Sequence, residues 1–115
     1  MTTFITALVI LIGAHFVGDY ALQTDYLANN KGKSLWILTA HSAIWSFCIT
    51  LTAGLLGFSP TLFGMVVILF VPHFVIDKMK VRKIYLFADM SDKSCLILDQ
   101  YLHMIQLLVY LAITF

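Results

Sequence analysis

Hydrophobic residues fill four long windows of the chain, and polar residues gather in the shorter stretches between them. A helix needs about 20 mainly apolar residues to cross the hydrocarbon core of a bilayer. The windows fit that length, and we predict membrane spans at residues 3–22, 35–56, 61–79 and 94–115. The predicted fold is therefore all-α: a polytopic membrane protein whose single domain, residues 1–115, is a four-transmembrane-helix bundle.

The connections between the windows carry residues that end helices. Residues 23–34 include asparagines and a glycine, and Gly57–Pro60 predicts a tight hairpin with proline at the start of the next helix. Residues 80–93 are long enough for a short interfacial helix.

Composition excludes a soluble monomer. The chain is 61% hydrophobic and 11% charged, with a mean hydropathy of +0.94, whereas soluble domains carry about 25% charged residues. A soluble protein of this size must cover much of its surface with polar groups, and this chain lacks them. The same scarcity of polar residues argues against disorder.

The basic residues are confined to two of the three connections and the span ends beside them. The hairpin and both termini carry no Lys or Arg. The positive-inside rule then predicts that connections 23–34 and 80–93 are cytoplasmic and that both termini are extracytoplasmic. The seven basic residues are Lys31, Lys33, Lys78, Lys80, Arg82, Lys83 and Lys93.

All four histidines and three of the six aspartates fall inside the predicted spans. Three His–Asp pairs have i,i+4 spacing, which places each pair on one helix face. At 1.5 Å per residue, all four histidines lie ~10 Å from the predicted cytoplasmic interface. Inward-facing groups at one depth of a bundle meet. The pairs are His15–Asp19, His73–Asp77 and Asp99–His103, and His41 is the fourth histidine.

The chain also contains an internal echo. The pattern H-F-V-x-D occurs at residues 15–19 and again at 73–77, which is 58 residues later. The same shift takes His41 to Asp99 and Trp45 to His103. This register is typical of two helical hairpins related as parallel repeats.

Imidazole and carboxylate groups are standard ligands for divalent transition metals, and we expect zinc first, with manganese or iron as alternatives. The chain has no glutamate, so a general base has to be an Asp or a His. The aspartates Asp19, Asp77 and Asp99 are therefore the predicted catalytic residues. The alternative reading of each His–Asp pair is a hydrogen-bonded clamp between helices. The predicted metal ligands are His15, Asp19, His41, His73, Asp77, Asp99 and His103.

Other polar residues extend these stripes. Gln23, Gln100 and Gln106 lie on or beside them and are expected to hydrogen-bond the ligands. Pro72 cannot donate to the carbonyl of Ile68, which leaves that acceptor free next to the candidate site. A basic group beside the third connection sets topology and would also attract anionic headgroups or phosphates to the mouth of the site. These residues are Lys78, Lys80, Arg82 and Lys83.

The stretch from His15 to Asp25, H-F-V-G-D-Y-A-L-Q-T-D, resembles a family of small bacterial and phage membrane proteins known as domain of unknown function 3307. Residues 73–77 and L-D-Q-Y-L-H at 98–103 carry the same likeness, which covers nearly the whole chain. The resemblance implies a multi-pass protein of a bacterial-type inner (plasma) membrane and no established activity. A weaker likeness, resting on the His/Asp-rich spans, points to membrane-bound metal-dependent hydrolases.

These patterns favour a metal-dependent hydrolase whose site opens to the cytoplasm and acts on a lipid or phosphorylated substrate. Two other functions use the same residues. The His/Asp cluster could relay protons or cations across the membrane, or it could only specify packing in a non-catalytic interaction or regulatory protein. The expected partners are the lipid bilayer and an anionic lipid or phosphorylated substrate, without nucleic acid. The oligomeric state stays open, a homo-oligomer included.

Overall fold

The computed structural model describes residues 2–115, which form helices and no strand. The chain runs through α1 (Phe4–Phe16) and its π-helical continuation η1 (Val17–Ala21), α2 (Asp25–Asn30), α3 (Leu35–Leu55), the π-helical η2 (Gly64–Phe70) and its continuation α4 (Val71–Arg82), the 3-10 turn η3 (Tyr85–Phe87) and α5 (Asp92–Thr114). The all-α prediction is confirmed.

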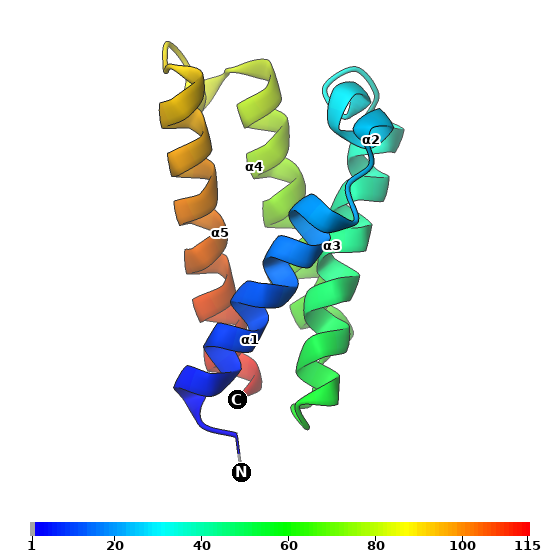
Figure 1. Cartoon of the computed structure of the whole chain (residues 1–115), viewed down its shortest axis with the longest axis vertical. Coiled ribbons are helices and arrows are strands. Elements are labelled where there is room, and N and C mark those ends of the chain that lie inside the picture. Colours follow the sequence, from blue (N-terminus) through cyan, green and yellow to red (C-terminus); the bar gives the residue numbers. More distant parts are fainter. Residues whose placement is uncertain (1) are drawn as a thin grey trace.

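The long helices pack side by side in a bundle of 44 × 24 × 24 Å, and α1 crosses the others obliquely (Figure 1). Both termini lie at one end of the bundle, while α2 and the α4–α5 connection lie at the other (Figure 1). All seven basic residues belong to these two regions or the helix ends beside them. We call this the basic end. The two basic connections therefore lie at the same end of the bundle.

Three helices are long and apolar enough to cross a membrane: Phe4–Ala21, Leu35–Leu55 and Asp92–Thr114. The fourth predicted span, 61–79, is helical but does not meet the same criterion. Its helix runs on to Arg82, so its last turns contain four charged residues. Length and composition therefore support three of the four predicted spans.

The connections differ in detail from the prediction. Residues 23–34 contain the short helix α2, which Thr24 caps by accepting a hydrogen bond from the Leu27 backbone N–H. Residues 80–93 are long enough for a short interfacial helix, but α4 extends to Arg82 and ends on Lys83 in the left-handed region, with φ 50°. A single 3-10 turn follows and buries Phe87. At the opposite end, Gly57 turns the α3–η2 hairpin with φ +88°.

The apolar core occupies the terminal half of the bundle. Ala7 and Leu11 of α1 meet Ile49 and Ala53 of α3 and the C-terminal half of α5 there. Apolar side chains also cover the outside, and Ile5 and Leu55 are 73% and 80% exposed. Burying apolar surface in the core while exposing more around the bundle is the pattern of a helical protein surrounded by lipid. The core cluster is Ala7, Leu11, Trp45, Ile49, Ala53, Leu69, Leu107, Tyr110 and Leu111.

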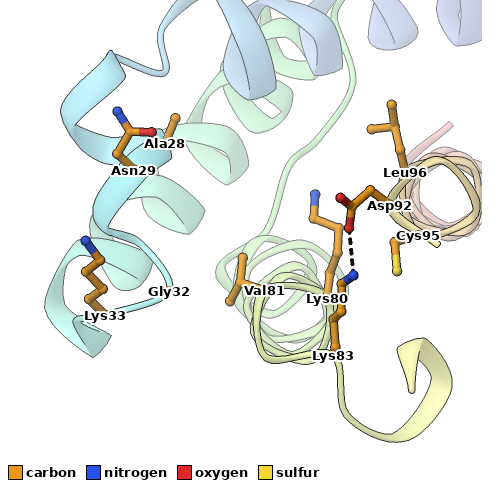
Figure 2. Close-up of a pocket in the computed structure, with 10 residues that line it drawn as sticks. All are labelled: Ala28, Asn29, Gly32, Lys33, Lys80, Val81, Lys83, Asp92, Cys95 and Leu96. Atoms are coloured by element: carbon orange, nitrogen blue, oxygen red, sulfur yellow. Dashed lines mark ion pairs between the residues drawn. The ribbon is translucent and has the colours of Figure 1, made fainter. Parts of the chain in front are cut away.

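A pocket of about 550 Å³ opens at the basic end between α2, α4 and α5 (Figure 2). Its wall contains the side chains of Lys33, Lys80 and Lys83 together with Asp92. The pocket therefore lies among the basic residues, on the side of the bundle away from the apolar core.

Candidate metal centre

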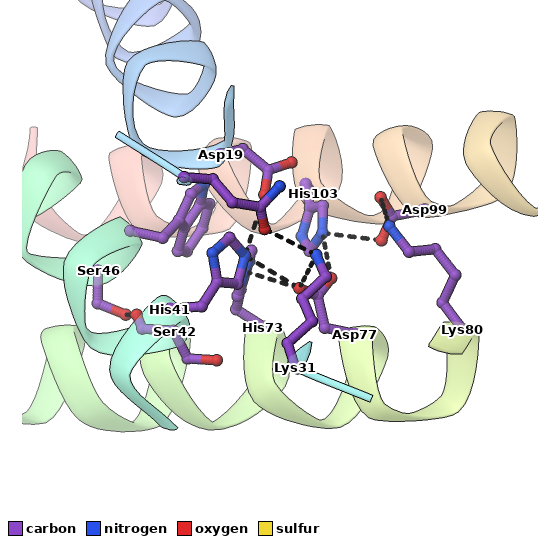
Figure 3. Close-up of polar contacts among 12 residues, drawn as sticks. Asp19, Lys31, His41, Ser42, Ser46, His73, Asp77, Lys80, Asp99 and His103 are labelled. Atoms are coloured by element: carbon purple, nitrogen blue, oxygen red, sulfur yellow. Dashed lines mark hydrogen bonds and ion pairs between the residues drawn. The ribbon is translucent and has the colours of Figure 1, made fainter. Parts of the chain in front are cut away.

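The four histidines and three aspartates predicted as ligands are all buried, and they gather between α1–η1, α3, α4 and α5 (Figure 3). The ring centroids of His73 and His103 are 4.4 Å apart, those of His41 and His73 5.2 Å, and those of His15 and His103 5.5 Å. The prediction that the histidines meet at one depth is confirmed.

Four of these residues form a tight group: Asp19, His41, His73 and Asp77. The Nε2 atom of His41 lies 3.2 Å from Asp19 Oδ1, 3.1 Å from Asp77 Oδ2 and 3.2 Å from His73 Nε2. Ligand atoms around a tetrahedral zinc with bonds of about 2.0–2.1 Å are about 3.3–3.4 Å apart. The spacing of this four-residue group already fits one such ion.

A second group consists of Asp19, Asp99 and His103, so that Asp19 belongs to both groups. The Nε2 atom of His103 lies 3.0 Å from Asp99 Oδ1. Four protein ligands are typical of structural zinc sites, whereas three leave a coordination position for water or substrate. The three-residue group therefore offers three protein ligands, one fewer than the four-residue group.

Gln106 orients His103. The Gln106 amide nitrogen donates to the backbone carbonyls of Ile68, at 2.8 Å, and Leu69, at 2.6 Å. Its oxygen is then left to accept from His103 Nδ1, at 3.2 Å, so the network assigns a proton to Nδ1 and directs Nε2 toward the carboxylates. The carbonyl of Ile68 is the one that Pro72 leaves free. The prediction that proline frees an acceptor beside the site is confirmed.

His15 has the opposite proton arrangement and belongs to neither group. The indole N–H of Trp45 donates to His15 Nδ1 at 2.8 Å, so the His15 proton is on Nε2, which contacts Gln100 Oε1 at 2.9 Å. The Gln100 amide in turn donates to Asp19 Oδ2 at 3.3 Å and Asp99 Oδ2 at 3.1 Å. Gln100 therefore lies between His15 and the carboxylates: it contacts His15 through its amide oxygen and the two aspartates through its amide nitrogen.

The i,i+4 argument did not hold for His15 and Asp19 because the helix changes type between them. His15 is in α1 and Asp19 is in the π-helical η1. A π-helix pairs residues i and i+5 and has a wider turn. The two side chains therefore reach Gln100 rather than each other, whereas Asp99 and His103 in the regular helix α5 remain in contact.

Trp45 contacts two of the site histidines, although the sequence pattern did not single it out as a site residue. Its ring stacks on His73 with centroids 4.2 Å apart, and its N–H fixes the His15 tautomer. The internal echo contained the signal, since Trp45 and His103 are 58 residues apart and occupy equivalent positions. One half of the chain has a donor-only indole where the other half has the imidazole of a candidate ligand.

Residues 7–115 match the model of a family described as Protein of unknown function (DUF3307). The chain belongs to this family. No curated protein and no solved structure matches it. The match confirms the resemblance seen in the sequence, and it contains every residue of both ligand groups.

Two lysines of this DUF3307 protein place ammonium groups beside the carboxylates (Figure 3). Lys31 is buried, and its Nζ lies 3.3 Å from Asp77 Oδ2 and 3.0 Å from Gln23 Oε1. Lys80 Nζ lies 3.0 Å from Asp99 Oδ2. The sequence had assigned Lys31 only to topology and Gln23 to the ligands, but the two residues bond to each other. Three carboxylates and two ammonium groups leave one net negative charge beside the histidines.

Several buried atoms of the cluster have no hydrogen-bond partner among the described residues. They include Asp77 Oδ1, Asp99 Oδ1 and His103 Nε2, although His103 Nε2 lies within 3.6 Å of both carboxylate oxygens. Acceptor atoms that face one another in a buried site are costly unless a proton or a cation lies between them. Buried His and Asp groups of this protein could therefore hold a metal ion.

Proposed function

We propose that this DUF3307 protein is a membrane-embedded metal-dependent hydrolase that acts on a lipid or phosphorylated substrate. The observation that supports it best is the presence of two adjoining ligand groups that share Asp19, one with four protein ligands and one with three. Zinc fits this donor set first, and manganese or iron are the alternatives.

The two ligand groups would have different roles. The four-residue group would hold one ion, and the three-residue group would hold a second ion with an open position. Asp19 belongs to both groups and would help to hold both ions. A metal in the open group would lower the pKa of a bound water to about 7 and polarise the substrate.

Asp77 would act as the base. Its Oδ2 faces His41 and His73 at 3.1 and 3.5 Å, and its Oδ1 points toward His103 Nε2 at 3.6 Å and has no hydrogen-bond partner. The second oxygen is therefore available to accept a proton from a water at the three-residue group.

A membrane location is part of the proposal. Three apolar helices are long enough to span, and residues 61–79 would form a fourth span whose charged end reaches the interface. The positive-inside rule places the basic end in the cytoplasm and both termini outside, in an inner (plasma) membrane. The ligand groups would then open toward the cytoplasm.

Metal analysis of the purified protein tests the proposal directly. We expect two transition-metal ions per chain in the wild type, one in His41→Gln, one in His103→Gln and fewer than one in Asp19→Asn. His15→Gln is the matched control, because His15 is equally buried but belongs to neither ligand group, and it should retain metal. A metal-free wild type purified without chelators would overturn the proposal.

Hydrolysis requires its own measurement. A metal-loaded protein should cleave a chromogenic phosphate monoester, and His103→Gln should lose that activity more than His41→Gln because only His103 belongs to the open group. Stoichiometric metal without any hydrolysis would favour the non-catalytic interaction protein instead.

The apolar core argues against proton or cation translocation. A translocator needs a polar route on both sides of its site, but the terminal half of the bundle is filled by the apolar cluster that includes Leu11, Ile49 and Leu107. In proteoliposomes we expect no flux. A flux that disappears in His41→Gln and His103→Gln would favour translocation.

A further inference from the structure

The pocket at the basic end has the size and charge of a site for a small anion-bearing ligand. Its volume of about 550 Å³ falls in the range of about 300–1,000 Å³ common for small-molecule sites. Lys33, Lys80 and Lys83 line the pocket, and Asp92 is the single acidic residue in its wall (Figure 2). The charged groups in the wall therefore carry two net positive charges.

Lys80 joins this pocket to the candidate metal centre. It lines the pocket, and its Nζ lies 3.0 Å from Asp99 Oδ2, while Asp99 belongs to the three-residue ligand group. An anion bound to Lys80 would compete with Asp99 for the ammonium group. Asp99 Oδ2 would then become available as a ligand when the anion arrives.

The outer part of the pocket contains an exposed ion pair between Lys83 and Asp92. Lys83 Nζ lies 2.7 Å from Asp92 Oδ1, and both side chains are exposed, by 49% and 93%. The hydrogen bond that Lys83 donates to Asp92 raises the pKa of the Lys83 ammonium, so Lys83 stays charged at neutral pH. Exposed pairs of this kind contribute little to stability, and an incoming anion can displace Asp92.

We infer that this pocket binds a phosphate monoester and presents it to the three-residue group, with Lys33 and Lys83 holding the phosphate from outside and Lys80 from inside. Lysine is a common phosphate ligand, and a phosphate group offers several oxygens to several ammonium groups at once. The role of the pocket in presenting a substrate rests on the proposed hydrolase function. Phosphate binding by the pocket does not depend on that function. The phosphate can belong to a lipid headgroup or to a soluble molecule.

Calorimetric titration of purified protein in a neutral detergent tests the inference with two probes, inorganic phosphate and dodecyl phosphate. We expect Lys33→Gln and Lys83→Gln each to weaken binding severalfold and the double variant to weaken it by about tenfold, which corresponds to about 1.4 kcal/mol. The sequence had grouped Lys78 and Arg82 with Lys80 and Lys83 as phosphate-attracting residues, but the pocket lining includes only Lys80 and Lys83 of these four. Lys78→Gln and Lys93→Gln are therefore matched controls, since both lysines are at the basic end but do not line the pocket. These controls should bind like the wild type.

The outcomes separate the inference from the proposed function. No binding of either probe, or equal weakening by the pocket and control variants, overturns the inference even if metal is present. Lysine-dependent binding in a protein that holds no metal supports the inference and contradicts the hydrolase. Tighter binding of dodecyl phosphate than of inorganic phosphate assigns the site to a lipid headgroup, and equal binding assigns it to a soluble phosphate.

Discussion

Gln106 makes a specific prediction because it connects the backbone of the η2–α4 helix to a candidate ligand. Replacing it by methionine, which has similar length but no amide, removes three hydrogen bonds at once: those to Ile68 O, Leu69 O and His103 Nδ1. The helices keep their apolar contacts, since a methionine side chain fills irregular space well.

The magnitude follows from these contacts. Hydrogen bonds between membrane helices contribute about 0.6 kcal/mol each on average, and those in soluble proteins about 1 kcal/mol. Three lost bonds therefore lower the free energy of unfolding by about 2–3 kcal/mol. The loss also frees His103 to rotate or to change tautomer, and partners of this kind typically change metal affinity by about 10–100-fold.

Two assays on the same protein distinguish these effects. A zinc titration against a competing chelator measures affinity, and a denaturant titration in mixed micelles, followed by helical circular dichroism, measures stability. Leu107→Ala is the control, because Leu107 is fully buried in the apolar cluster next to Gln106 in the chain and should lose about 2–5 kcal/mol of stability with unchanged zinc affinity. A Gln106→Met protein that binds zinc as tightly as the wild type would refute the assignment of the His103 tautomer.

Two further substitutions test the packing and the charge of the site. Gly18→Ala should lower the free energy of unfolding by about 1–3 kcal/mol, because its new Cβ would lie 3.1 Å from the Trp45 Cα; Gly13→Ala, with nothing within 4 Å of its Cβ, should leave stability unchanged or slightly raised in the same denaturant titration. Lys31→Met should raise zinc affinity by about tenfold or more, since it removes a positive charge 3.3 Å from Asp77 Oδ2. An unchanged affinity in the chelator competition would show that no ion binds next to Asp77.

Much of the architecture could be predicted from the amino-acid sequence alone. Periodicity and composition predicted the helices and their order, and the placement of lysines predicted that both basic connections lie at one end. Proline chemistry alone predicted the free carbonyl of Ile68, because the missing N–H of Pro72 is a covalent fact. Counting residues along each helix also predicted that the four histidines meet.

Details that depend on helix type were less accessible. The π-helical turn at η1 changes the direction of Asp19 relative to His15, and hydrophobic periodicity does not reveal such turns. The end of the third predicted span, at residue 79, differs from the end of the helix for a related reason. The helix α4 continues through four charged residues to Arg82. An apolar window ends where charge begins, but a helix whose last turns reach an interface need not.

The sequence by itself predicted that the four histidines share one depth, because their spacing along helices is a local property. Only the tertiary structure decided their roles. His15 and His103 have the same side chain, but the indole of Trp45 donates to one ring while the amide of Gln106 accepts from the other. A neutral imidazole places its proton according to its partners, and partners that lie on other helices are known only after the bundle has packed.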